Sequence, residues 1–175
     1  MKRFVLLVLI LITGLTVFSQ GIEFQKERYA EVLEMAKKQN KLVFIDIYTS
    51  WCGPCKHMAD NVFPQAKVGE YYNAHFLNLQ LDAEKSEDGK MVAKTFGVSA
   101  YPTFLFVNGD GELVYRFLGG KTVDMFVKEG EKAVDAFALY PFIPKKNIQS
   151  LVLQGIGCSS CVSAFQYIPE YFAWI

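Results

Sequence analysis

The sequence predicts an α/β fold in which helices flank both faces of a central mixed β-sheet. Residues 42–48 and 76–81 form two nearly continuous apolar runs, which are typical of strands buried on both faces. Segments with helical periodicity alternate with these runs. Near the end of this pattern, Asn108-Gly109-Asp110-Gly111 separates two further apolar runs and gives a strong hairpin signal. The resulting order β-α-β-α-β-α-β-β-α describes a mixed sheet covered by helices.

Each element has its own local signal. In the first helix an apolar stripe faces one way and lysines gather near the C-terminal end, where the helix dipole favours them. Pro54 suits the first turn of a helix, Gly97 ends one, and Thr122 is a good N-cap for the last. The predicted strands are 22–24, 42–48, 76–81, 103–107 and 112–117, and the predicted helices are 27–39, one opening at Pro54, 65–74, 89–96 and one from Thr122 to about 138.

Composition indicates a folded protein that does not bind nucleic acid. The chain has 175 residues, of which 51% are apolar and 15% aromatic, so it can bury a substantial core. Its formal net charge is zero, and no run of basic residues is long enough to hold a phosphate backbone.

The first residues resemble a secretory leader. Lys2 and Arg3 precede an apolar stretch over residues 4–15, and the small residue Ser19 permits cleavage before Gln20. We expect residues 1–19 to be a signal peptide and the mature protein to be periplasmic or otherwise extracytoplasmic, where disulfides persist. The alternative is a membrane anchor at residues 4–18, although this stretch is short for a spanning helix.

The rest of the chain divides into a predicted domain at residues 20–140 and a tail at 141–175 of uncertain role, expected to be disordered. Residues 147–169 carry no charge and include a second cysteine pair, Cys158 and Cys161. That pair is suited either to pass electrons to Cys52 and Cys55 or to bind a metal ion. The composition fits better with a poorly ordered segment added to the end of the domain.

The motif WCGPCK at residues 51–56 allows three kinds of chemistry. A zinc site needs more ligands nearby, and a disulfide between Cys52 and Cys55 closes too small a loop to stabilise the fold much. The motif follows a buried strand and opens a helix, where free N–H groups and the helix dipole stabilise a thiolate. A thiolate is the species that attacks a disulfide, so redox exchange is favoured.

Cys55 lies one turn into the helix, and we expect it to be more buried than Cys52 and to resolve a mixed disulfide. Asp46, on the apolar strand before the motif, is a candidate base for Cys55. Desolvation raises the pKa of a buried carboxyl, which suits it to accept a proton. The alternative is that Asp46 only marks the end of burial on its strand.

These residues, together with Ala100-Tyr101-Pro102-Thr103 before a later strand, closely resemble the thioredoxin family. The likeness covers roughly residues 27–138 and is strongest to secreted single-domain members and to the C-terminal domain of periplasmic transmembrane disulfide reductases. It implies a thioredoxin fold in which Cys52 is the nucleophile and Cys55 the resolving cysteine. Pro102 would be a cis-proline beside them, in a groove that pairs with an extended substrate. The substrate-binding residues implied are Trp51, Gly53, Pro54, Tyr101 and Pro102.

The sequence also departs from the family pattern. The lysine that family members place near the buried aspartate aligns with Asn78, a family tryptophan is replaced by Tyr48, and residues 84–90 form a longer, charged connection. The first difference leaves open which side chain adjusts the pKa of Asp46.

The resemblance implies a thiol–disulfide oxidoreductase that needs no cofactor and no metal. A Gly-Pro pair between the cysteines is typical of thioredoxins, whose potential is about −270 mV, which favours a reductase or isomerase over an oxidant. The partners implied are misoxidised proteins or cytochrome apoproteins as substrates, and a transmembrane thiol reductase as electron donor. The alternatives are a non-catalytic binding module with a permanently closed disulfide and a metal carrier that uses both cysteine pairs. We expect His57 and His75 to be surface residues without a metal.

Overall fold

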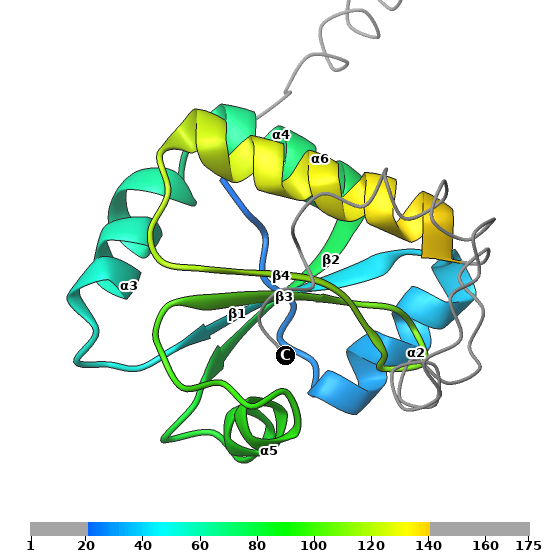
Figure 1. Cartoon of the computed structure of the whole chain (residues 1–175), viewed down its shortest axis with the longest axis horizontal. Helices are drawn as coiled ribbons and strands as arrows, with labels where there is room; N and C mark the ends of the chain where they lie inside the picture. Colours follow the sequence, from blue (N-terminus) through cyan, green and yellow to red (C-terminus); the bar gives the residue numbers. More distant parts are fainter. Residues whose placement is uncertain (1–20, 141–175) are drawn as a thin grey trace, which may run out of the picture. The chain divides into compact units, whose positions relative to one another are not determined.

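The computed structural model describes residues 21–140, so the predicted signal peptide, the predicted tail and the Cys158–Cys161 pair lie outside the described residues. The described strands form one sheet in the order β2-β1-β3-β4 (Figure 1). β1 pairs in parallel with β2 and antiparallel with β3, and β3 pairs antiparallel with β4, so the predicted mixed sheet is confirmed. The strands are β1 (Leu42–Tyr48), β2 (Phe76–Asp82), β3 (Thr103–Val107) and β4 (Leu113–Leu118).

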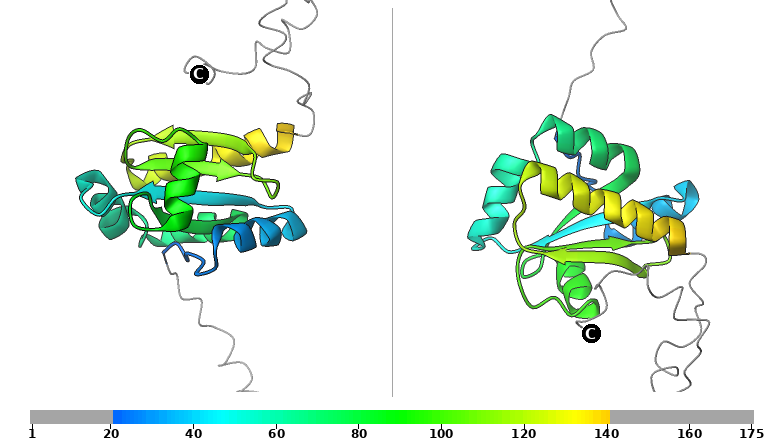
Figure 2. Two further views of the ribbon diagram at one scale, coloured as in Figure 1. Left: turned by 90° about the horizontal axis from the view of Figure 1, so that it is seen from below. Right: turned by 45° about the horizontal axis from the view of Figure 1, so that its top comes forward.

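Helices cover both faces of this sheet, as predicted (Figures 1 and 2). Two helices, α4 and α6, lie over one face, while α2 and α5 lie over the other. A short helix, α3, follows β1 and continues directly into a π-helical segment, η1. The bounds are α2 (Tyr29–Gln39), α3 (Gly53–His57), η1 (Met58–Val62), α4 (Ala66–His75), α5 (Glu87–Thr95) and α6 (Val123–Leu139).

The two faces of the sheet bury different side chains because successive residues of a strand point to opposite faces. On β1, Phe44 belongs to the core beneath α4 and α6, whereas Val43 and Ile45 belong to the core beneath α2 and α5. The first core is rich in aromatic rings, and Tyr72 stacks on Phe126 with 4.6 Å between ring centroids. Burial on both faces explains why β1 reads as an unbroken apolar run.

Some boundaries differ from the prediction. The short strand expected at residues 22–24 is a single bridge between Phe24 and Asn78. The helix predicted from Gly89 begins two residues earlier, because the Ser86 side chain caps it by accepting a hydrogen bond from the Gly89 N–H at 2.8 Å. Thr122 caps α6 in the same way, as predicted, by accepting from the N–H of Met125.

Within residues 21–140 no helix combines the length and the apolar character needed to cross a bilayer.

Candidate redox site

Cys52 and Cys55 form a disulfide at the start of α3. The S–S distance is 2.01 Å and the two Cα atoms are 5.3 Å apart. Cys52 is the N-cap residue of α3, and its Sγ accepts a hydrogen bond from the Cys55 N–H at 3.1 Å. Pro54 occupies the first turn, where its missing N–H breaks no helical hydrogen bond. A sulfur that accepts a backbone N–H at a helix start is held as a thiolate more readily once the disulfide is reduced.

The prediction that Cys55 is more buried than Cys52 is wrong for this closed form. Cys52 is 3% exposed and Cys55 is 5% exposed. With the bond closed, both sulfurs lie against the first turn of α3, so burial does not distinguish the attacking sulfur from the resolving one.

Asp46 is a buried carboxyl on the same face of β1 as Phe44, the face that packs against η1, α4 and α6. It is 2% exposed and pairs across the sheet with Phe104 on β3. Removal from water raises its pKa from 3.8 to about 7, while a hydrogen bond from Gln80 acts in the opposite direction. Asp46 therefore does not mark an end of burial, because Ile47 beyond it is also buried.

Gln80, and not Asn78, occupies the position next to Asp46. The parallel register of β1 and β2 sets Asp46 opposite Gln80, whose Nε2 donates to Asp46 Oδ2 at 2.9 Å. Asn78 lies opposite Phe44, two residues away, and its side chain donates to Glu23 and Asn73 instead. Asn78, which aligns with the family lysine, is therefore not the side chain that contacts the carboxyl of Asp46 in this chain. The strand register sets Gln80 there instead.

Trp51 and Tyr101 lie together beside the disulfide-bearing turn. Their rings meet edge to face with 5.9 Å between centroids. Trp51 nevertheless remains largely in solvent, at 65% exposure. The indole N–H of Trp51 donates to both carboxylate oxygens of Glu84 at 3.1 Å. Sequence reasoning did not identify Glu84 as part of the site, although its place in the unusually charged 84–90 connection was a signal.

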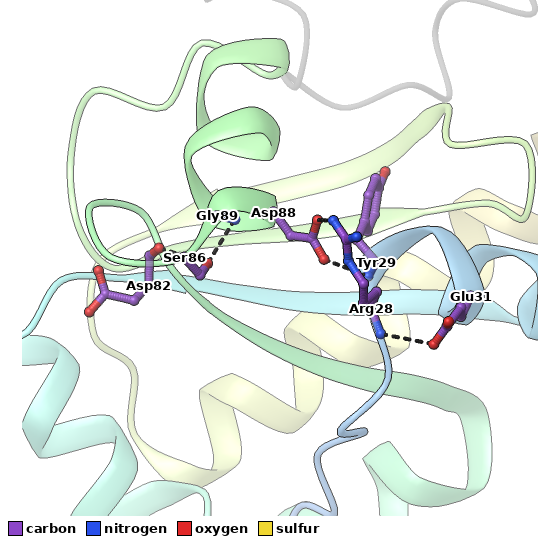
Figure 3. A network of polar contacts seen from close by, with 7 residues as sticks. All are labelled: Arg28, Tyr29, Glu31, Asp82, Ser86, Asp88 and Gly89. Carbon is purple, nitrogen blue, oxygen red and sulfur yellow. Dashed lines mark hydrogen bonds and ion pairs between the residues drawn. The ribbon is translucent and has the colours of Figure 1, made fainter.

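Polar contacts hold the segment from Asp82 to Gly89, which includes Glu84, and Figure 3 shows those made by Ser86 and Asp88. Asp82 Oδ1 accepts from the N–H groups of Glu84 and Lys85, both at 2.9 Å. Further along, Asp88 accepts from the N–H of Tyr29 at the start of α2 and pairs with Arg28, each at 3.0 Å. The connection after β2 is thus tied to its own strand, and the first turn of α5 is tied to the start of α2.

Pro102 lies where the sequence pattern places it, directly before β3. The Tyr101–Pro102 peptide bond is cis, as the resemblance implies. Pro102 is buried and Tyr101 is half-buried, whereas Gly53 and Pro54 are exposed on the turn between the cysteines. The structure therefore brings the expected substrate-contacting residues to one end of the sheet.

The described residues contain no group of His, Cys, Asp and Glu side chains suited to a metal ion. His57 is exposed and lies within hydrogen-bond distance of Asn61. His75 ends α4 and stacks on Tyr71. Both histidines are surface residues, as predicted.

Comparisons with known proteins agree with this geometry. Residues 29–133 match the family described as "Thioredoxin-like domain", which is more than half of the chain. Thioredoxin H4 of Arabidopsis thaliana is 38% identical over 96 residues, which are 55% of this chain and 75% of that protein. Thioredoxin family members are thiol–disulfide oxidoreductases.

Solved structures show the same fold. A disulphide-isomerase candidate from Bacteroides thetaiotaomicron is 42% identical, with a TM-score of 0.59, over 66% of this chain and 95% of that one. The oxidised C-terminal domain of Neisseria meningitidis DsbD, 23% identical with a TM-score of 0.51 over 64% of this chain and 98% of that one, shares the fold. The disulfide at the start of α3, the cis-proline and these matches together show that the chain belongs to the thioredoxin-like family.

Proposed function

We propose that this protein is an extracytoplasmic thiol–disulfide oxidoreductase that reduces or isomerises disulfides of other proteins through Cys52 and Cys55. The observation that carries the proposal is the position of Cys52 as the N-cap of α3, with its Sγ accepting the Cys55 N–H. This arrangement stabilises the thiolate needed for attack on a disulfide.

The reaction proceeds in two exchanges. In the reduced protein the Cys52 thiolate attacks one sulfur of a client disulfide, which forms a mixed disulfide and releases the other client sulfur as a thiolate. The Cys55 thiol then loses its proton and attacks the Cys52 sulfur, which restores the internal disulfide and releases the second client thiolate. Two electrons pass from the cysteine pair to the client, and the released thiolates take protons from water.

Asp46 is the proposed acceptor for the Cys55 proton. A carboxyl with a pKa of about 7 is partly ionised near neutral pH, so it can take a proton and later return it to water. Its place on the face of β1 that packs against η1, which continues directly from the Cys55 helix α3, supports this role.

Clients are proposed to bind as extended segments beside the disulfide. Trp51 and Tyr101 offer an aromatic surface, and the exposed Gly53 and Pro54 leave the cysteine turn open to an approaching chain. Main-chain pairing with the segment before β3 makes little demand on client sequence, which suits a protein with many substrates.

Two features support the direction and the place of the reaction. The Gly-Pro pair favours reduction, and the relative that is 42% identical is a disulphide-isomerase candidate, which favours isomerisation. The leader expected at residues 1–19 favours an oxidising compartment, where a reductant needs electrons from a transmembrane thiol reductase. Suitable substrates are misoxidised proteins and cytochrome apoproteins.

Reduction of insulin disulfides in the presence of dithiothreitol tests the proposal. The wild-type chain should accelerate the reaction, and Cys52→Ser should lose that acceleration. Cys55→Ser should instead accumulate mixed disulfides with client proteins, because the first exchange proceeds and the second cannot. A variant that lacks both cysteines but retains Cys158 and Cys161 gives the background. Equal activity of Cys52→Ser and wild type would exclude the proposal and favour a binding module whose disulfide stays closed.

A further inference from the structure

The buried carboxyl of Asp46 has one hydrogen-bonded oxygen and one without a partner. Gln80 Nε2 donates to Oδ2 at 2.9 Å. The other oxygen, Oδ1, is buried and has no hydrogen-bond partner among the described residues. A buried carboxylate oxygen without a partner is costly, so its free lone pairs point to a transient partner.

Gln80 also borders a hollow at the surface. The hollow has a volume of about 390 Å³ and is lined by Gln80, by Ala59 on η1 and by the N-terminal segment, residues 21–24. Gln80 is half-buried, so its amide stands between the hollow and the carboxyl. A neutral amide that contacts both therefore separates Asp46 from solvent without adding a charge.

The wall of this hollow is fixed by hydrogen bonds. Asn78 Nδ2 donates to Glu23 O at 3.3 Å, and the Gln25 N–H donates to Asn78 O at 2.8 Å. On the other side the Ile22 N–H donates to Phe63 O at 2.8 Å. The N-terminal segment is thus pinned to β2 and to the end of η1, which holds the surroundings of Gln80 in place.

We propose that Gln80 is a positioning residue for Asp46, which holds Oδ2 with a neutral amide so that Oδ1 stays available to the Cys55 thiol. The inference rests on the proposed function and deepens it. In the resolving step the S–H bond of Cys55 breaks and an O–H bond forms at Asp46. The Cys55 sulfur then joins Cys52 as the client thiolate leaves.

The surroundings of Asp46 leave the neutral amide of Gln80 as its hydrogen-bonding neighbour. Phe104, across the sheet, is apolar, and among the described residues no lysine or arginine acts on the pKa of Asp46, which responds to burial and to Gln80. Titratable groups on the neighbouring elements include Tyr48 on β1, Asp82 on β2 and Asp60 on η1, and Glu23 lies in the N-terminal segment. Helix α3 carries Cys55 and the exposed Lys56 and His57.

Stopped-flow reaction of the reduced full-length chain with the chromogenic disulfide dithiobis(nitrobenzoate) separates the two exchanges. Release of the first coloured thiolate reports attack by Cys52, and release of the second reports resolution by Cys55. The variant that lacks both cysteines supplies the background from Cys158 and Cys161.

The second phase should depend on pH with a midpoint set by Asp46. Gln80→Leu removes the donor to the carboxylate and should raise that midpoint by about one pH unit, while Gln80→Lys adds a cation and should lower it. Gln65→Leu is the matched control, because it removes an exposed amide that donates to Asn61 O, and it should leave the midpoint unchanged.

The outcomes separate the two proposals. Absence of a first phase in wild type would contradict the oxidoreductase function itself. Two normal phases with the same second-phase midpoint in wild type, Gln80→Leu and Gln80→Lys would overturn the role of Gln80 and leave the function intact. Opposite shifts of the second-phase midpoint in Gln80→Leu and Gln80→Lys, with the first phase unchanged, would support the positioning role of Gln80 and exclude a purely structural one.

Discussion

Asp46 links the redox site to folding stability, because an ionised carboxylate does not belong in an apolar sheet. Phe104 lies opposite it on β3, Phe44 lies two residues before it on β1, and Gln80 is its one amide donor among the described residues. Its protonation should therefore influence both the resolving step and the free energy of unfolding.

Replacing Asp46 with asparagine should stabilise the protein at alkaline pH. The pKa of the carboxyl is 3.8 ordinarily and about 7 in the folded state, so the folded state holds a proton that the unfolded state has lost between these values. The contribution of Asp46 to stability is therefore full below pH 3.8 and falls as pH rises to about 7. Asp46→Asn should exceed wild type by roughly 4 kcal/mol at pH 8 and nearly match it at pH 4. Urea unfolding of the oxidised proteins at both pH values measures this, and an equal difference at the two values would contradict it.

Glu84 should matter for client binding rather than for stability. It anchors the exposed Trp51 indole, and the contact lies at the surface. Glu84→Ala should raise KM for a protein disulfide by roughly two- to tenfold, with kcat and the unfolding free energy nearly unchanged. Glu84→Gln keeps an acceptor oxygen for the indole and should retain most of the wild-type KM. Steady-state kinetics would contradict the idea if Glu84→Ala lowered kcat instead.

The sequence alone identified the functional side chains that residue type and spacing along the chain make recognisable. Cys52 and Cys55 stand out by their motif, and Asp46 stands out as a charge in an apolar strand. Glu84 and Gln80 could not be found in this way, because their roles depend on a loop conformation and on strand register. For the same reason the sequence did not show that Gln80, rather than Asn78, contacts Asp46.

At the level of secondary structure, β1 and β3 were predicted at their observed bounds because continuous apolar runs end abruptly at polar or turn residues. Helix starts were less predictable. α5 begins at Glu87 because Ser86 caps it, and a cap depends on backbone geometry that periodicity does not record.

Gly89 is a position where no side chain fits. A Cβ there would lie 2.1 Å from the backbone oxygen of Asp82, a contact with the end of β2 that cannot relax cheaply. Gly89→Ala should destabilise the domain by about 2 kcal/mol or more. Gly53→Ala is the control, because a Cβ at Gly53 meets nothing within 4 Å, and its unfolding free energy should change by less than about 0.5 kcal/mol. Thermal or urea unfolding of both variants tests this, and similar losses would contradict it.

Asp88 should stabilise α2 from a neighbouring helix. It accepts from the Tyr29 N–H at the start of α2, which has no side-chain cap bond from its own N-cap residue Arg28. Asp88→Ala should cost about 1 kcal/mol, as loss of a cap does. Asp88→Asn keeps an acceptor and loses only the ion pair to the exposed Arg28, so it should recover most of that loss. Urea unfolding measures the stability of both variants. An Asp88→Asn protein as unstable as Asp88→Ala would show that the ion pair with Arg28 dominates.

At the level of the domain, the sheet order places β1 and β3 in the centre and β2 and β4 at the edges. All residues of β3 are buried, whereas Leu113 and Leu118 at the ends of β4 are exposed. Backbone amides of β1 and β3 should therefore exchange with deuterium most slowly and those of β4 faster. Hydrogen-exchange mass spectrometry checks this, and equal protection of β4 and β1 would contradict it.

The overall topology was predictable because strand order, the hairpin signal and the motif placement agree with one another. The family match over residues 29–133 covers the described sheet and most of the helices around it. The segment at residues 21–25, which borders the site, was predicted as a short strand at 22–24. Asparagine side chains and a single bridge hold it instead of a strand ladder, and no periodic pattern in the sequence indicates that arrangement.

The pH dependence of Cys52 alkylation in the reduced Cys55→Ser protein examines the thiolate at the start of α3 most directly. The rate of modification by iodoacetamide, followed at Cys52 by mass spectrometry, should reach half its maximum at least one pH unit below the value of about 8.5 for an ordinary cysteine. A midpoint at or above about 8.5 would show that the helix start does not hold the sulfur ionised, and it would contradict Cys52 as the attacking group.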